Sequence, residues 1–268
     1  ECLVGSEMCI RDSIRSVAKK HGITFSKPGN GVCHQLQLEN FAKPGKTLVG
    51  SDSHTPTCGA MGMIAIGAGG LDVAVAMATG TYYLQCPSVV RVNLVGKKAK
   101  WASAKDVILY ILQQLSVKGG VNKIIEYTGE GLKELSLTDR ATICNMGAEL
   151  GATTSVFPTD EITKEYLIQQ GREEDYVELK ADEDATYDEE ITVDLSKLVP
   201  LTAKPHSPDA VVPVSELRGM KINQVVIGSC TNSSLPDMLK AAKILKGRRV
   251  ATHVSLVIAP GSSSILAM

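Results

Sequence analysis

Three polar side chains follow a short apolar segment in residues 47–57, Thr-Leu-Val-Gly-Ser-Asp-Ser-His-Thr-Pro-Thr. The run 47–49 predicts a buried strand, and Asp52, Ser53 and His54 come just after it. Open α/β sheets bind ligands at the carboxyl ends of their strands, so a carboxylate, a hydroxyl and an imidazole here suggest a site. A polar turn capped by Asp52 is an equally good interpretation. Pro56 is expected to prevent continuation as a strand or early entry into a helix.

Glycines are dense in the following run, residues 58–72. The spacing is not that of a dinucleotide-binding loop, because Asp72 stands where the third glycine of G-x-G-x-x-G would fall. An acidic side chain at the start of the next helix would also repel a phosphate. We therefore expect a loop that packs tightly around something other than a dinucleotide, followed by a closely packed helix over 71–79.

Asn145 and Glu149 are four residues apart on a predicted helix that Thr138 would cap. This spacing places them on one face. Their neighbours are mostly small and apolar, so a polar pair would need partners inside the protein. A solvent-facing pair is an equally good interpretation of this segment.

Cys230 lies in the loop Gly-Ser-Cys-Thr-Asn-Ser-Ser, between a predicted strand over 224–227 and a predicted helix over 235–245. The helix N-terminus should lower the thiol pKa and favour a thiolate. Three interpretations stay open: a small residue in a tight turn, a nucleophile, or a ligand of a metal cluster. One cysteine cannot hold an iron–sulfur cluster, and the other six have no cluster-type spacing.

Composition excludes several classes of function. The net charge is −1 and aromatic residues make up 4% of 268 residues, which argues against general binding to nucleic acid or to an anionic membrane. The longest weakly polar run, 60–71, is too short to span a bilayer. Seven cysteines without a C-x-x-C pair, and no secretory signal, favour a reducing compartment. We expect a cytoplasmic protein.

The pattern of elements predicts an α/β protein with three-layer α/β/α domains. Residues 1–13 resemble translated sequencing-adapter DNA and are expected to be non-native, with a short helix from 13 to 21 after them. We expect a partial first domain over 14–87, a second over 88–205 and the start of an incomplete third over 206–268. Four prolines in 197–213 suggest a connection between the last two.

Four ordered motifs, residues 50–57, 67–72, 141–155 and 227–233, resemble the aconitase superfamily, and the similarity runs from about Ser16 to the end. The resemblance implies reversible dehydration and hydration of a hydroxy-tricarboxylate, with a [4Fe-4S] cluster as Lewis acid. Residues 145–158 are more similar to aconitate hydratases of a compact bacterial type, which implies citrate–isocitrate isomerisation through cis-aconitate in the tricarboxylic acid cycle. Homoaconitase and the isopropylmalate dehydratase large subunit are the related alternatives.

The resemblance also implies roles for individual residues. His34 pairs with Asp52 and His54 with Glu149 as catalytic groups, Ser53 and Asp52 contact substrate, Asn145 and Asn232 lie near the cluster, and Cys230 is the first of three cluster ligands. The other two ligands, the catalytic serine and most substrate-binding arginines are expected after Met268, in C-terminal domains of the same protein. We therefore expect this chain alone to be inactive.

Two other classes of function compete with the hydro-lyase. A family member that has lost its cluster could act as an RNA-binding regulator, which near-neutral charge and few aromatics disfavour. A glycine-loop nucleotide-binding module is disfavoured by Asp72. Our main interpretation therefore includes a small tricarboxylate substrate and neither a membrane nor a nucleic-acid partner.

Overall fold

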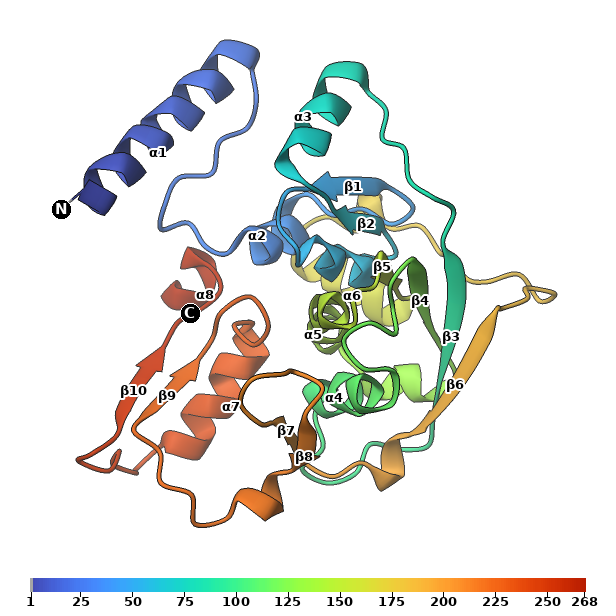
Figure 1. Ribbon diagram of the computed structural model, residues 1–268, viewed down its shortest axis with the longest axis vertical. Helices are drawn as coiled ribbons and strands as arrows, with labels where there is room; N and C mark the ends of the chain where they lie inside the picture. The colour runs from blue at the N-terminus through green and yellow to red at the C-terminus, as the bar shows by residue number, and fades with distance from the viewer. Residues whose placement is uncertain (1) are drawn as a thin grey trace.

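Strands and helices alternate along the chain, which a computed structural model describes from residue 2, with side chains from residue 10 (Figure 1). The α-helices are α1 (Cys2–His21), α2 (Cys33–Asn40), α3 (Gly70–Thr79), α4 (Ala104–Leu115), α5 (Leu137–Gly147), α6 (Glu161–Gln169), α7 (Leu235–Leu245) and α8 (Ser263–Ala267). The strands are β1 (Thr47–Gly50), β2 (Ile64–Gly67), β3 (Ser88–Val95), β4 (Lys123–Thr128), β5 (Thr154–Val156), β6 (Glu189–Asp194), β7 (Leu201–Ala203), β8 (Val211–Pro213), β9 (Gln224–Ile227) and β10 (Ser255–Ile258).

The largest sheet is parallel, with strand order β5-β4-β3-β6. Burial alternates along β3: Val90, Val92 and Leu94 are fully buried, and the residues between them are half-buried. Helices α4 and α5 lie beside the buried face (Figure 1). The predicted α/β class is therefore confirmed.

The other face of this sheet is polar. Arg91 on β3 donates a hydrogen bond from Nε to Oγ1 of Thr128 on β4, at 2.9 Å. Tyr187 donates to Glu126 at 3.3 Å, and the Arg91 guanidinium lies 5.4 Å from the Tyr187 ring centroid. Within the described residues, this sheet thus has its helical layer on one face and charged side chains on the other.

The glycine-rich run holds more regular structure than the sequence predicted. A 3-10 helix, η1 (Thr55–Met61), follows the site residues, and β2 then pairs in parallel with β1. The expectation that Pro56 would delay a helix was wrong, because Pro56 lies in the first turn of η1, where a missing N–H costs nothing. The fully buried η1 packs against α5 and β5 and belongs to the core.

Three further expectations are corrected. Ser136, not Thr138, caps α5, because its hydroxyl and the Asp139 carboxylate form a reciprocal capping box. Helix α3 begins one residue before the predicted range and is not closely packed: it has no buried residue, and Leu71 is 79% exposed. Helix α1 begins at Cys2 instead of residue 13 and ends before Gly22, whose φ is +65°.

The proline-rich stretch 197–213 is not a plain connection. Strands β7 and β8 pair antiparallel within it and pack on α4. The Asp106 carboxylate on α4 accepts a 2.6 Å hydrogen bond from the Leu201 N–H. The predicted domain boundary at 205 therefore falls inside a hairpin that is anchored to the preceding unit.

The C-terminal part contains a two-stranded parallel sheet, β9 and β10, with α7 beside it (Figure 1). It meets the N-terminal part at residues 30–32, where the Val32 N–H donates to Gly261 O at 2.8 Å and Gly31 bridges Ser262. The Gly261 N–H in turn donates at 2.9 Å to the carbonyl of Ser233, in the loop that carries Cys230. No described helix combines the length and the apolar character that crossing a membrane requires.

Candidate active site

The first histidine–carboxylate pair joins α2 to the end of β1. His34, in the first turn of α2, is buried, and its Nε2 lies 3.1 Å from Asp52 Oδ1. The same Asp52 oxygen accepts the backbone N–H of His54 at 2.8 Å. Asp52 thus fixes the His34 ring and the turn that leads to the second histidine.

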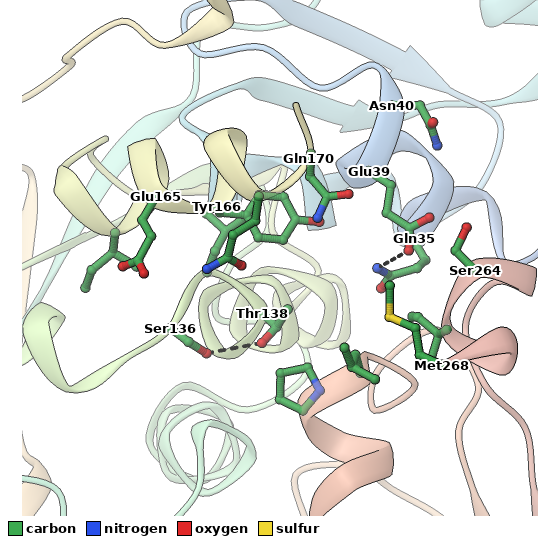
Figure 2. A pocket seen from close by; sticks show the side chains of 16 residues that line it. Gln35, Glu39, Asn40, Ser136, Thr138, Glu165, Tyr166, Gln170, Ser264 and Met268 are labelled. Carbon is green, nitrogen blue, oxygen red and sulfur yellow. Dashed lines mark hydrogen bonds between the residues drawn. The ribbon is translucent and has the colours of Figure 1, made fainter. Parts of the chain in front are cut away.

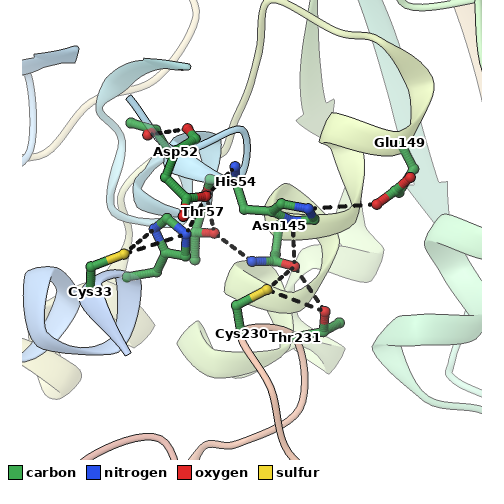
Figure 3. A network of polar contacts seen from close by, with 10 residues as sticks. Cys33, Asp52, His54, Thr57, Asn145, Glu149, Cys230 and Thr231 are labelled. Atoms are coloured by element: carbon green, nitrogen blue, oxygen red, sulfur yellow. Dashed lines mark hydrogen bonds and ion pairs between the residues drawn. The ribbon is translucent and has the colours of Figure 1, made fainter. Parts of the chain in front are cut away.

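The second pair is built around His54, the residue before η1 (Figure 3). Its Nδ1 lies 3.0 Å from Asn145 Oδ1, and its Nε2 lies 3.6 Å from Glu149 Oε1. Asn145 is on α5, and Glu149 is in the 3-10 turn Ala148–Leu150 that follows it. The predicted contacts of His34 with Asp52 and of His54 with Glu149 are both confirmed. The centroids of the His34 and His54 rings lie 6.5 Å apart.

Two glycines allow η1, α5 and β5 to approach closely enough for these contacts. A Cβ on Gly59 would lie 1.7 Å from the Ser155 carbonyl oxygen, and one on Gly147 would lie 2.3 Å from Ser155 Oγ. Real Cβ atoms do not come this close, so both positions exclude larger side chains. The two glycines therefore let His54 approach Asn145 through close backbone packing.

Three threonines that the sequence analysis overlooked hold the network together. Thr57 Oγ1 accepts from Asn145 Nδ2 at 2.8 Å, and Thr231 Oγ1 donates to Asn145 Oδ1 at 2.9 Å. Thr142 on α5 donates to the Thr231 carbonyl at 3.0 Å, which docks the cysteine loop on α5. The only sequence signal for Thr57 and Thr231 was their place beside His54 and Cys230.

The two histidines have opposite electrostatic environments. Burial lowers the pKa of His34 despite the neighbouring Asp52. Interaction with the Cys230 sulfur, only partly opposed by burial, raises the pKa of His54 to about 9, with further contributions from Asn145 and Glu149. Partial burial raises the pKa of Asp52, but the His54 N–H and the His34 ring outweigh it, so that pKa is lowered.

Cys230 joins the site through its sulfur, which lies 3.6 Å from Asn145 Oδ1. Interaction with His54 lowers the pKa of this thiol to about 7, against the opposing effect of burial. The sequence analysis attributed the low pKa to the helix dipole, but the main cause is His54. Two expected residues are less involved: Ser53 is exposed, and the Asn232 side chain makes no hydrogen bond to the described residues.

The donor set fits one corner of an iron–sulfur cluster. Cys230 is a half-buried sulfur with a lowered pKa, as a thiolate ligand requires. Cys58 and Cys144 are buried with raised pKa values and face the core. Cys33 Sγ lies 3.7 Å from His34 Nδ1 and forms, with His34 and Asp52, the one described group of potential metal ligands. The described residues thus supply one cluster-type thiolate.

A cavity of about 380 Å³ lies between α2, α5, α6, α7 and α8 (Figure 2). Gln35, Glu39, Glu165 and Tyr166 are among its lining side chains, and Gln35 donates to Glu39 at 2.9 Å. None of the residues of the two histidine–carboxylate pairs lines it. The cavity is therefore separate from the polar network.

The fold and the network form a candidate acid–base site on a parallel α/β scaffold: two histidines paired with carboxylates beside a cysteine of low pKa. The sequence matches the aconitase family (aconitate hydratase) over residues 7–268, so the chain belongs to the aconitase family. The match begins upstream of the expected Ser16 and includes part of the stretch expected to be non-native.

Curated relatives carry several names within this family. The chain is 45% identical to the 3-isopropylmalate dehydratase large subunit 2 of Archaeoglobus fulgidus, over 94% of this chain and 61% of that protein. It is 42% identical to the mitochondrial aconitate hydratase of Schizosaccharomyces pombe and to the mitochondrial homocitrate dehydratase of Saccharomyces cerevisiae, in each case over 96% of this chain and 35% of the relative. The chain thus spans about a third to three fifths of these relatives.

Proposed function

We propose that the protein containing this chain is a hydro-lyase of the aconitate hydratase type, which interconverts citrate and isocitrate through cis-aconitate. The observation that supports this most is His54, held between Asn145 and Glu149 and next to Cys230. Dehydration needs an acid that protonates a departing hydroxyl, and hydration needs the same group to take a proton back.

The His54–Glu149 pair can perform both proton transfers. The 3.6 Å separation lets Nε2 and Oε1 share a proton after modest side-chain movement, and Glu149 is exposed enough to reach a ligand. The raised pKa of His54 keeps its imidazolium available to neutralise Glu149. His34, with its lowered pKa, can stay neutral at the same pH while Asp52 stays ionised.

We propose Cys230 as one ligand of a [4Fe-4S] cluster, which when bound would supply a Lewis acid for the substrate hydroxyl and carboxylate. Asn145 and Asn232 are proposed to lie near it, and Ser53 and Asp52 to contact substrate. The remaining ligands, the serine base and the arginines are assigned to other parts of the protein. Cytoplasmic location stays a prediction, and the mitochondrial names belong to relatives.

A steady-state assay of the complete, reconstituted protein tests the function. Citrate, isocitrate and cis-aconitate are supplied separately, and products are identified by chromatography. We expect interconversion of all three, which His54→Gln abolishes. If the absorption spectrum shows a cluster and the protein converts none of the three compounds, aconitate hydratase activity is refuted.

Isopropylmalate dehydration is the second candidate, and the 45% identity to an isopropylmalate dehydratase large subunit favours it. Because that relative is named a large subunit, this assay also includes a small-subunit gene product from the organism that supplies the complete protein. Activity on isopropylmalate, together with none on citrate, would select this candidate.

A further inference from the structure

The hydroxyl of Thr57 has only one proton, and the structure shows which acceptor receives it. Thr57 Oγ1 lies 2.6 Å from the His54 carbonyl oxygen, one turn earlier in η1. A carbonyl oxygen can only accept, so at this distance the Thr57 hydroxyl must donate to it. Thr57 is 3% exposed, so water does not offer an alternative arrangement.

The orientation of the Asn145 carboxamide follows from that assignment. Asn145 is fully buried, and one end of its carboxamide lies 2.8 Å from Thr57 Oγ1. Because the Thr57 proton is already used, Thr57 Oγ1 can only accept here, and Asn145 must present its NH2 group. Its Oδ1 then points to His54 and to Thr231, whose hydroxyl donates to it at 2.9 Å.

The His54 tautomer follows in turn. With Asn145 Oδ1 3.0 Å from His54 Nδ1, this nitrogen must carry a hydrogen. The Nε2 atom then faces Glu149 Oε1 at 3.6 Å. If the carboxamide were flipped, its NH2 would donate to Nδ1 and neutral His54 would carry its hydrogen on Nε2.

We propose that Thr57 is a positioning residue that fixes the Asn145 carboxamide and, through it, the His54 ring, with the Nδ1–H held by Asn145 Oδ1 and the Nε2 atom facing Glu149. Thr57 itself touches no reacting atom in this scheme. Its hydroxyl selects one of two carboxamide orientations that would otherwise both satisfy Asn145, Thr231 and His54. The catalytic consequence rests on the proposed function, whereas the tautomer does not.

The complete protein labelled with 15N-histidine tests the tautomer directly. The His54 signals are those lost in His54→Gln, and two-bond 1H–15N correlations above the pH of His54 deprotonation report which nitrogen holds the hydrogen. We expect Nδ1–H in the wild type and in Thr57→Ser, which keeps the hydroxyl. Thr57→Val has nearly the same shape without the hydroxyl, and we expect a mixture of the two tautomers.

Thr55→Val is the matched control. Thr55 is equally buried in η1 and donates a similar 2.6 Å bond to the Asp52 carbonyl, but it makes no hydrogen bond to Asn145. It should leave the His54 tautomer unchanged even if it lowers stability. An Nε2–H tautomer in the wild type, or an unchanged Nδ1–H in folded Thr57→Val, would overturn the proposal. The wild-type spectrum decides the assignment even if the valine variant does not fold.

Turnover supplies the second measurement. In Thr57→Val we expect kcat to fall by about 10- to 100-fold with little change in KM, as is typical when the partner that orients a site residue is removed. Thr57→Ser should restore most of the rate. A wild-type protein with the Nδ1–H tautomer but no hydro-lyase activity would refute the proposed function and leave the positioning role in place.

Discussion

At the scale of single residues, the site separates two chemically similar pairs by their surroundings. His34 is buried against one carboxylate and has a lowered pKa, whereas half-buried His54 meets Cys230, Asn145 and Glu149 and has a raised one. Such divergence between titratable groups is how one site provides an acid and a base at the same pH. The His54–Glu149 pair is thus the better candidate for proton transfer to substrate.

Replacing Glu149 with glutamine tests that assignment. In the complete protein, Glu149→Gln should lower turnover by about 100-fold or more, because the amide keeps the shape but cannot exchange the proton. The cluster absorption spectrum should stay intact, since Glu149 makes no hydrogen bond to Cys230 within the described residues. The measurement is the hydration rate of cis-aconitate at saturating substrate.

Glu216→Gln is the matched control for this charge change, because Glu216 is exposed in the short helix Val214–Leu217. It should retain the wild-type rate. Nearly normal hydration by cluster-loaded Glu149→Gln would remove Glu149 from the proton-transfer step.

The two pairs could be predicted through the family resemblance: Asp52, His54 and Glu149 lie in its ordered motifs, whereas His34 lies outside them. Thr57 and Thr231 could not be predicted, although they lie in the same motifs. What a threonine hydroxyl contacts depends on which segments meet in three dimensions, here η1, α5 and the loop after β9. Asn232 is the opposite case: its motif predicted a role near the cluster, but its side chain makes no hydrogen bond to the described residues of the network.

At the scale of elements, the close contact of η1 with β5 is what holds His54 in place. Gly59→Ala would put a methyl group 1.7 Å from the Ser155 carbonyl, and backbone cannot yield as a flexible side chain would. We expect the free energy of unfolding to fall by about 3 kcal/mol, the upper part of the usual range for overpacking. Urea-induced unfolding provides the measurement.

Gly70→Ala provides the comparison, because a Cβ at Gly70 meets nothing within 4 Å and Gly70 begins the exposed helix α3. Its stability should be equal to or slightly above that of the wild type. Equal stability of the two variants would show that η1 and β5 are not in contact as described.

An ion pair with a buried arginine anchors the helix that carries Asn145. Arg140 on α5 is fully buried and donates to both oxygens of Asp160, at 2.9 and 2.6 Å. Burial raises the pKa of Asp160, but the Arg140 hydrogen bonds and charge outweigh it, so the pKa is lowered. Asp160→Asn would leave the buried Arg140 charge without its counter-ion, and because solvent screens the 36% exposed Asp160 side chain, we expect a loss of about 1–3 kcal/mol.

The lowered pKa of Asp160 also predicts a pH dependence. The stability from this carboxylate is fully present above its unfolded pKa of about 3.9 and is lost as pH falls through the lower folded value. The stability difference between wild type and Asp160→Asn, measured by urea unfolding, should therefore shrink below about pH 4. A difference that stays constant from pH 7 into this acidic range would contradict the ion-pair assignment.

Most elements could be predicted from periodicity and capping signals, and the failures have physical causes. β2 has four residues and ends in glycine, so its pattern is too short to distinguish from the surrounding loop. The hairpin of β7 and β8 lies among prolines that indicate turns, yet Pro213 ends an edge strand, where no donor is needed. Long helices such as α4 carry both a capping box and a wide apolar face, and these were predicted correctly.

At the scale of the whole molecule, apolar side chains remain exposed on α3, α7 and the β9–β10 sheet. Met77 is 66% exposed, Leu239 60% and Val226 61%. A two-stranded parallel sheet buries little surface, and parallel sheets are normally covered on both faces. The unit that holds Cys230 is therefore less packed than the unit around β3, where the large buried core residues gather.

The last prediction concerns the 268-residue chain by itself, which we expect to be inactive and unable to retain a [4Fe-4S] cluster. Stable clusters use three or four protein ligands. Cys230 has the lowered pKa of a ligand, whereas burial raises the pKa of Cys58 and Cys144 in the core, and partial desolvation together with the Asp52 charge raises the pKa of Cys33. A cluster held by one thiolate would be lost to exogenous thiols or to oxygen.

Anaerobic reconstitution of this chain with iron and sulfide, followed by desalting, measures the outcome. Little iron should remain, and citrate and isocitrate should not interconvert. Cys230 should then react with a thiol reagent near neutral pH faster than Cys33, because its pKa is about 7, and Cys230→Ser should remove that fast phase. Retention of about four irons per chain together with turnover would contradict the prediction. One protein thiolate cannot hold four irons, so that result would mean that the chain contains a complete cluster site.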